Sequence, residues 1–282
     1  MAESAGKRFF EALNLEKPLQ MVGTINAYTA IMAQRVGFHA IYLSGAGVAN
    51  SSYGLPDLGL TTLENVLEDA SRITSAVNLP LLVDIDTGWD SSLMIERAIK
   101  ELLHVGVAGV HIEDQVSTKK CGHLADKEIV PKEEMVDRIS AAVEAKGDNS
   151  FVIMARTDAF AAEGLDGAIE RALAYKDAGA DMLFPEAMAE LEHYRTIRNA
   201  VGIPILANLT EFGKTPLFTL NELKDAEVDI ALYPLSANRA MNKAALDVFK
   251  EIRQHETQKG CLDQMQTREE LYDFLKYDPR KC

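Results

Sequence analysis

The sequence predicts an α/β protein built as one closed (β/α)8 barrel over residues 1–282, with residues 255–282 as a helical extension. Three observations predict this fold. Eight short apolar runs recur along the chain, and a longer segment of helical period follows each of them. Most runs are almost continuously hydrophobic, which is typical of parallel strands covered on both faces. A chain of 282 residues has an ordinary length for a single barrel.

The eight apolar runs are the expected strands of this barrel. In chain order they are Leu19–Thr24, Ala40–Gly45, Leu81–Asp86, Gly109–Asp114, Phe151–Asp158, Met182–Ala187, Ile205–Thr210 and Ile230–Leu235. An open, doubly wound parallel sheet is the alternative arrangement. No GxGxxG pattern follows the first run, so the closed barrel is favoured.

Helix signals lie between the runs. Thr61 and Glu64 have the spacing of a capping box, and apolar residues at helical intervals follow them. Pro131 suits a first helical turn, because its missing N–H has no partner there in any case. Asp166 suits the cap of the next helix, and Gly179 suits its end. These signals predict helices on the outside of the barrel.

The C-terminal part of the chain also has helical patterning. Thr267 and Glu270 form a second capping box, which predicts a short last helix. Before it, apolar residues continue at helical intervals after the eighth run; they are Met241, Ala244, Val248 and Ile252.

Composition excludes several classes of protein. The net charge of −14 disfavours nucleic acid and anionic membranes, so neither is an expected partner. No apolar run reaches the roughly 18 residues that span a membrane, and the N-terminus lacks an apolar signal core. We therefore expect a cytoplasmic protein. Cys121, Cys261 and Cys282 are too few and too scattered for a disulfide framework, and we expect thiols.

Polar residues gather where the expected strands end. A (β/α)8 barrel carries its active site at the C-terminal ends of its strands, so these positions are the most informative in the chain. Six runs end in such residues, namely Ser44–Gly47, Asp84 with Asp86, Glu113 with Asp114, Arg156–Asp158, Glu186, and Asn208 with Thr210. Random surface placement would not concentrate them in this way.

Asp84 and Asp86 predict a metal site. Residues two apart on a strand point to the same side, and two carboxylates on one side repel each other unless a cation lies between them. With Glu113 from the next strand they offer hard oxygens and no soft ligand, which suits Mg²⁺ or Mn²⁺. Solvated loop acids, or partners of Arg156, are the alternative interpretation.

A basic segment with a thiol follows the fourth expected strand. It reads Lys119-Lys120-Cys121-Gly122-His123. Neighbouring cations favour the thiolate and lower the pKa of a cysteine, so Cys121 suits an acid–base group or a nucleophile. A basic surface loop with an incidental cysteine fits the same letters equally well.

Other strand-end residues have both a functional and an ordinary interpretation. Ser44–Gly47 would offer backbone N–H groups to a carboxylate, or form a simple turn. Arg156 would bind a carboxylate in bidentate fashion, or sit in a structural ion pair. Asn208 and Thr210 would bind substrate oxygens, or be ordinary strand-end polar residues with partners in the protein. His111, inside the fourth run, is interpreted as a core residue.

Longer motifs resemble one known family. K-K-C-G-H after a strand ending H-I-E-D-Q resembles the signature loop of the isocitrate lyase/phosphoenolpyruvate mutase superfamily, and D-I-D-T-G resembles its metal loop. The resemblance extends from near residue 20 to near residue 275, through G-L-P-D-L-G, F-V-I-M-A-R-T-D, M-L-F-P-E-A, I-L-A-N-L-T-E-F-G and M-Q-T-R-x-E-L-Y.

The resemblance implies an activity and an assembly. It implies cleavage of the C2–C3 bond of 2-methylisocitrate to pyruvate and succinate, a step of propionate catabolism through the methylcitrate cycle. It implies Mg²⁺, with Mn²⁺ as a substitute, on Asp84 and Asp86, and a contribution from Glu113 through water. It implies a homotetramer in which a C-terminal helix is exchanged between subunits.

The resemblance also implies roles for individual residues. Cys121 is the implied acid–base group, with Lys119 and His123 orienting its loop, and Tyr42 or Glu186 is a candidate for the base that takes the substrate's hydroxyl proton. The implied substrate contacts are Ser44, Gly45, Ala46, Asp57, Cys121, Gly122, Arg156, Glu186, Asn208, Leu209, Thr210, Arg239 and Arg268.

Three alternatives stay open at this point. A related lyase would act on isocitrate or 2,3-dimethylmalate; Leu124-Ala125-Asp126, after His123, is close to the isocitrate lyase form of the motif. A non-catalytic barrel would bind a dicarboxylate, although binding alone needs no proton donor. A Schiff-base aldolase would need a lysine at a strand end, and none of the expected strands ends in one.

Overall fold

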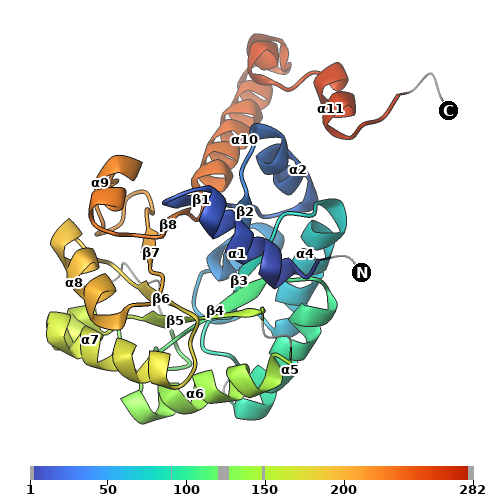
Figure 1. Ribbon diagram of the computed structural model, residues 1–282. Coiled ribbons are helices and arrows are strands. Elements are labelled where there is room, and N and C mark those ends of the chain that lie inside the picture. The colour runs from blue at the N-terminus through green and yellow to red at the C-terminus, as the bar shows by residue number, and fades with distance from the viewer. Residues whose placement is uncertain (1–2, 90, 120–126, 148–149, 279–282) are drawn as a thin grey trace.

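The expected barrel is present in the computed structural model, which describes residues 3–89, 91–119, 127–147 and 150–278. Eight parallel strands form one sheet in the order β6-β5-β4-β3-β2-β1-β8-β7, and a bridge between Leu183 and Ile205 brings β6 back to β7. Figure 1 shows the strands at the centre and the helices around them. The strands are β1 Leu19–Gly23, β2 Ala40–Leu43, β3 Leu81–Asp84, β4 Gly109–Glu113, β5 Val152–Thr157, β6 Met182–Pro185, β7 Leu206–Asn208 and β8 Ile230–Tyr233.

All eight predicted strands are confirmed, and each ends one or two residues before its apolar run does. The final residues of the runs lie beyond the strands, at the C-terminal end of the barrel, although some of them, such as Ile85 and Leu209, still donate a backbone hydrogen bond to the next strand. The register between strands then sets which side chains are neighbours at this end. Asp84 pairs with His111, and Glu113 pairs with Arg156.

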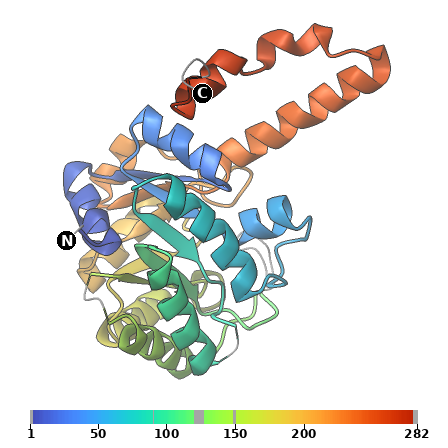
Figure 2. The ribbon, with the colours of Figure 1, turned by 90° about the vertical axis from the view of Figure 1, so that its right-hand side faces the viewer.

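The core has two layers. One lies inside the barrel and includes Leu19, Met21 and Leu82, together with Phe9 from α1, Ala5–Leu15. The other lies between the strands and the surrounding helices. Helix α1 covers the N-terminal end of the barrel (Figures 1 and 2), and Phe9 is completely buried there. Only the opposite end, where the strands finish, is available for a site.

The surrounding helices follow the strands as expected. They are α2 Ala27–Val36, α3 Gly45–Gly47, the π-helix η1 Val48–Ser52, α4 Leu63–Ala76, α5 Ser92–His104, α6 Lys132–Ala145, α7 Phe160–Asp177, α8 Leu191–Val201 and α9 Leu220–Asp225. After β8 come α10 Ser236–His255, the 3-10 helix η2 Lys259–Gln264 and α11 Arg268–Phe274.

Two predicted helix starts are wrong by a few residues. The capping box of α4 uses Thr62 and Asn65 instead of Thr61 and Glu64, because the Thr62 hydroxyl accepts from Asn65 N–H and the Asn65 side chain accepts from Thr62 N–H. Asp166 is no cap, since a helical segment begins at Phe160, is interrupted at the non-helical Gly164, and has already restarted when it reaches Asp166. The other predicted ends hold: α6 starts directly after Pro131, and Gly179 follows α7 with a left-handed φ of 102°.

Helix α10 projects away from the barrel and leads into η2 and α11 (Figure 2). The apolar stripe predicted this helix correctly, but the stripe is mainly solvent-exposed in this chain, with Met241 at 39% and Ile252 at 43%. The capping box of Thr267 and Glu270 is confirmed at the start of α11. Among the described helices, none is both long and apolar enough to cross a bilayer.

Candidate active site

A pocket of about 170 Å³ opens at the C-terminal end of the barrel. Most of the predicted site residues converge on it from different strands. Its lining includes Tyr42, Ser44, Ala46, Asp57, Asp84, Lys119, Arg156, Glu186, Asn208, Thr210 and Arg239, as expected, and also Asn50, Phe184, Pro234 and Leu235.

Some predicted residues lie elsewhere. Gly45, Asp86 and Glu113 are buried next to the pocket, behind the lining side chains, and Leu209 is buried in the core. Arg268 is an exposed residue of α11 and does not line the pocket. Cys121, Gly122 and His123 lie outside the described residues.

Asp84 is the centre of a buried hydrogen-bond cluster at the end of β3. It accepts from Gly45 N–H at 3.0 Å, from Asp86 N–H at 3.0 Å and from the Tyr42 hydroxyl at 3.4 Å. The Nε2 atom of His111 lies 3.5 Å from its other side. Asp84 is only 5% exposed, and this carboxylate is held by groups from the two neighbouring strands, from the turn after β3 and from α3.

Asp86 reaches the same site by a route that the strand pattern does not predict. The strand ends at Asp84, and Asp86 lies in the following turn with a left-handed φ of 48°. A Cβ atom placed on Gly45 would lie 3.0 Å from Asp84 Oδ2 and 3.1 Å from Asp86 Oδ1. The two carboxylates therefore face the same small space, although a turn brings them together and not strand alternation.

Lys119 supplies positive charge to this cluster. Its ammonium lies 2.5 Å from Asp57 Oδ1 and 2.6 Å from Asp86 Oδ1, and its side chain is 4% exposed. Burial acts in the opposite direction, but Asp86, Glu113 and the other acids hold the pKa of Lys119 well above its usual value. Burial raises the pKa of Asp86 to about 6. This concentration of buried acids needs cations.

The donor set fits Mg²⁺. Within the described part of the chain, no three His, Cys, Asp or Glu side chains converge closely enough to ligate one ion by themselves. Mg²⁺ usually keeps several waters and takes one or two carboxylates directly, which Asp84 and Asp86 provide. Glu113 is fully buried, and its Oε1 atom has no hydrogen-bond partner among the described residues. That oxygen suits a hydrogen bond to a water molecule bound to the ion.

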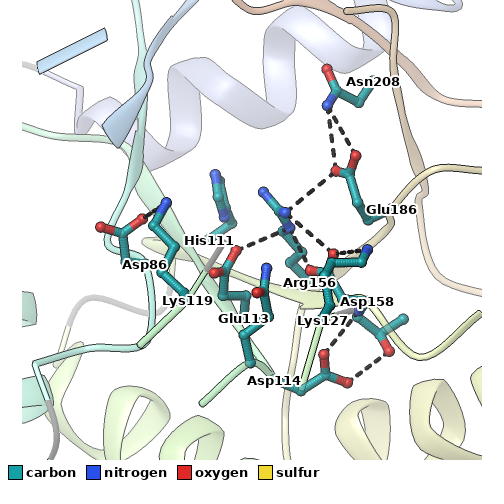
Figure 3. Close-up of polar contacts among 12 residues, drawn as sticks. Asp86, His111, Glu113, Asp114, Lys119, Lys127, Arg156, Asp158, Glu186 and Asn208 are labelled. Carbon is teal, nitrogen blue, oxygen red and sulfur yellow. Dashed lines mark hydrogen bonds and ion pairs between the residues drawn. The ribbon is translucent and has the colours of Figure 1, made fainter. Parts of the chain in front are cut away.

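Arg156 is fixed by a second set of acids beside this cluster (Figure 3). Its Nε lies 3.0 Å from Asp158 Oδ2 and 3.1 Å from Glu113 Oε2, and its Nη2 lies 3.7 Å from Glu186 Oε2. The guanidinium also lies over the Phe184 ring, 5.1 Å from its centroid. Arg156 lines the pocket, so a fixed cation stands next to the oxygen-rich cluster.

Three further expectations are refined by the geometry. Gly45 N–H points to Asp84, so this backbone donor organises the acids and is not directed at the pocket. Asn208 donates to Glu186 at 3.3 Å, which links the sixth and seventh strand ends. The Arg239 Nε atom lies 3.5 Å from Glu211, on the rim of the pocket.

Sequence reasoning missed two contributors. His111 is completely buried, as expected of a core residue, but its Nε2 lies 2.8 Å from the Tyr42 hydroxyl and its ring faces the site. Burial lowers the pKa of His111 to about 4, so the ring is neutral. The signal was available, because His111 is two residues before Glu113 on one strand. Lys127, which contacts Asp158, had no such signal.

The comparisons with known proteins agree with this geometry. The family model described as phosphoenolpyruvate phosphomutase matches residues 10–253. The chain is 62% identical to 2-methylisocitrate lyase from Escherichia coli (strain K12), over 97% of this chain and 93% of that protein. A solved 2,3-dimethylmalate lyase, a PEP mutase/isocitrate lyase superfamily member, superposes with a TM-score of 0.90 at 33% identity, over 97% of this chain and 92% of that one.

A third similar protein bears on the metal. A structure of phosphonopyruvate hydrolase in complex with oxalate and Mg²⁺ superposes with a TM-score of 0.84 at 25% identity, over 97% of this chain and 95% of that one. That hydrolase thus binds Mg²⁺ together with a small dicarboxylate.

Proposed function

The chain belongs to the phosphoenolpyruvate mutase/isocitrate lyase superfamily, and we propose that it is a carbon–carbon lyase that splits 2-methylisocitrate into pyruvate and succinate. The observation that carries the proposal is the pairing of two kinds of site in one pocket. An oxygen-only acid cluster, Asp84 with Asp86, suits a hard cation, and Arg156 beside it suits a carboxylate. A hydroxylated polycarboxylate can offer its hydroxyl and one carboxylate to the cation and another carboxylate to Arg156.

Asp84 and Asp86 would hold Mg²⁺ directly and Glu113 would hold it through water, with Mn²⁺ as a substitute. When bound, the ion supplies Lewis-acid polarisation of the substrate's hydroxyl and neighbouring carboxylate. The chain's own residues do the rest. Arg156 and Asn208 bind and orient the carboxylates of the succinate part, and Ser44 and Thr210 complete the pocket wall.

The reaction needs two proton transfers: a base removes the hydroxyl proton of the substrate, and an acid protonates the succinate carbon. Tyr42 or Glu186 takes the hydroxyl proton; the C–O bond becomes a ketone as the C2–C3 bond breaks. The electron pair of that bond stays on the succinate carbon, and charge builds up there that Arg156 offsets. The Cys121 thiol then gives its proton to this carbon, with Lys119 and His123 orienting the thiol. Pyruvate and succinate leave.

Tyr42 enters this reaction as a neutral phenol in the resting site. Burial, followed by the neighbouring Asp84, raises the pKa of Tyr42 well above its usual value. Its hydroxyl is 2.8 Å from His111 Nε2, in a layer directly beneath the acids. A phenol that keeps its proton this tightly is a poor base, so the raised pKa of Tyr42 favours Glu186 as the base, and substitution of each residue tests the choice.

The proposal extends to the assembly. We propose that residues 1–282 form one domain, and that four copies assemble with a C-terminal helix exchanged between subunits. The exposed apolar residues of α10 support this, since Phe249 is 68% and Leu246 is 48% exposed in the single chain. Light scattering on the purified protein tests it, and a monomer at micromolar concentration would contradict it.

The first experiment measures product release by the wild type and by Cys121→Ser. Pyruvate from 2-methylisocitrate and glyoxylate from isocitrate are followed side by side, with Mg²⁺ and with EDTA. We expect fast pyruvate release that EDTA abolishes, and a fall of at least about 100-fold in the variant, the size of a lost general acid. Absence of turnover would refute the named reaction, and 2,3-dimethylmalate is the next substrate to assay.

A further inference from the structure

A buried lysine lies behind Arg156, on the far side of Asp158. The side chain of Lys127 is 3% exposed, and its ammonium contacts Asp158 Oδ1, whose side chain is fully buried. Figure 3 shows Lys127, Asp158 and Arg156 in one chain of contacts. Lys127 does not line the pocket, so it acts on a bound molecule only through its neighbours.

The backbone holds Lys127 in place. Residues 114–116, directly after β4, pair with residues 128–130 in a short antiparallel stem, which we call the β4 stem. Val116 N–H donates to Glu128 O at 3.0 Å, and Val130 N–H donates to Asp114 O at 2.8 Å. Lys127 is the residue before this stem, so its ammonium approaches Asp158 from a fixed base.

Asp158 divides its two oxygens between the two cations. Oδ1 faces Lys127, and Oδ2 accepts from Arg156 Nε at 3.0 Å. The second Arg156 contact, from Nη2 to Oδ1, is long at 3.5 Å. The backbone N–H of Asp158 is itself fixed, because it donates to Asp114 Oδ1 at 2.8 Å. These contacts hold the carboxylate of Asp158 in one orientation. Because the Nη2 contact of Arg156 to this carboxylate is long, the terminal nitrogens of the guanidinium remain available to a molecule in the pocket.

Removal of the lysine charge would change this division. A carboxylate and a guanidinium prefer two parallel hydrogen bonds, and Oδ1 would become available for the second one. Within the described part of the chain, Arg156 is the other cation on Asp158, so the guanidinium would be drawn toward it and away from the pocket. We propose that Lys127 is a positioning residue of the lyase, which holds Asp158 so that Arg156 is presented to a substrate carboxylate.

This inference rests on the proposed function, and its test keeps the two apart. The steady-state kinetics of 2-methylisocitrate cleavage and the Kd of succinate, by calorimetry with Mg²⁺, are measured for the wild type and for Lys127→Met. Misplacement of a binding group costs up to about 100-fold, so we expect KM and the succinate Kd to rise together, each by about 10- to 100-fold. Lys127→Arg, which restores the charge, should bring both back to within about threefold of the wild type.

A matched control is five residues further along the chain. Lys132 forms a similar ion pair with Glu170, but their side chains are 32% and 70% exposed, far more than those of Lys127 and Asp158. Lys132→Met should leave KM and the succinate Kd unchanged, because exposed pairs contribute little.

Each outcome decides the question. Unchanged KM and succinate Kd in Lys127→Met, or a fall in kcat alone that matches a loss of folded protein, would overturn the inference. If Lys127→Met does not fold, Lys127→Gln takes its place with the same criteria, since it keeps a donor without the charge. If the wild type does not turn over 2-methylisocitrate, the proposed function fails, and the succinate Kd still decides the role of Lys127.

Discussion

Gly45→Ala should weaken Mg²⁺ binding and leave the fold of the barrel intact. Gly45 begins α3 directly over the acid cluster, and a Cβ there would lie 3.0 Å from Asp84 Oδ2, 3.1 Å from Asp86 Oδ1 and 3.3 Å from Asp84 Cγ. Its backbone is not in the left-handed region, so alanine is tolerated without backbone strain. The substitution therefore places one methyl group between two carboxylates and changes little else.

The size of the effect follows from these distances. Contacts of 3.0–3.1 Å are too short for a carbon and an oxygen, so both carboxylates must move by a few tenths of an ångström. Mg²⁺ requires oxygen ligands at about 2.0–2.1 Å in near-octahedral geometry. Disturbed support of ligands typically costs about 10- to 100-fold in metal affinity. We expect a rise of this size in the Mg²⁺ concentration at half-saturation.

The assay is the rise in Tm with added Mg²⁺ above an EDTA baseline, which follows binding without any need for turnover. Gly47→Ala is the control on the same short helix. A Cβ there would meet Ile25 and Leu235, both at 3.2 Å, so it is equally tight but contacts no carboxylate at these distances. An unchanged half-saturating Mg²⁺ concentration in Gly45→Ala, or an equal rise in both variants, would refute the assignment of the ion to Asp84 and Asp86.

Three further predictions concern the scaffold and are measured by chemical denaturation. Phe9→Ala should lower the free energy of unfolding by about 3–5 kcal/mol, because it leaves a cavity where the fully buried Phe9 ring closes the N-terminal end of the barrel; a loss below about 1 kcal/mol would contradict this. Tyr175→Phe removes a buried donor to Asp114 at 2.8 Å and should cost about 1.5–3 kcal/mol, whereas an unchanged midpoint would show that this bond contributes nothing. Arg171 lowers the pKa of Glu163, so this carboxylate stabilises the fold above its unfolded pKa of about 4.3 and ceases to do so as the pH falls through its lower folded value. Glu163→Gln should thus cost stability at pH 7 and nothing at pH 2, by less than about 1 kcal/mol since the side chain is 37% exposed; equal losses at both pH values would rule out a charge effect.

The strands were predictable because burial on both faces leaves a strong apolar signal. Every run begins at its strand or one residue before it. The exact ends were not predictable, since nothing in the sequence marks where a run leaves its strand: Ile85 and Leu209 are as apolar as the strand residues before them but lie beyond β3 and β7. The start of α4 shows the same limit: Thr61 and Thr62 are adjacent candidate caps, and only the tertiary position of the helix selects Thr62.

The site was predictable from the position of polar residues at strand ends, and less so from their local geometry. Asp84 and Asp86 were correctly placed together, but through a left-handed turn that no alternation rule contains. Lys119 was expected to orient a loop, but its position between Asp57 and Asp86 was not predicted. A contact between residues 62 positions apart depends on the folded barrel, and no local pattern encodes it.

The β4 stem has a consequence for how this chain tolerates insertions. Because residues 114–116 and 128–130 are already paired, the ends of the intervening segment are held together whatever its length. The entropy of closing such a segment grows only with the logarithm of its length, so doubling it costs about 0.6 kcal/mol. Segments of other lengths and compositions are therefore expected to be grafted between Lys119 and Lys127 with little effect on the Tm of the barrel, provided that these two buried lysines are kept. The segment that carries Cys121, the proposed proton donor, can in this sense be exchanged without rebuilding the barrel.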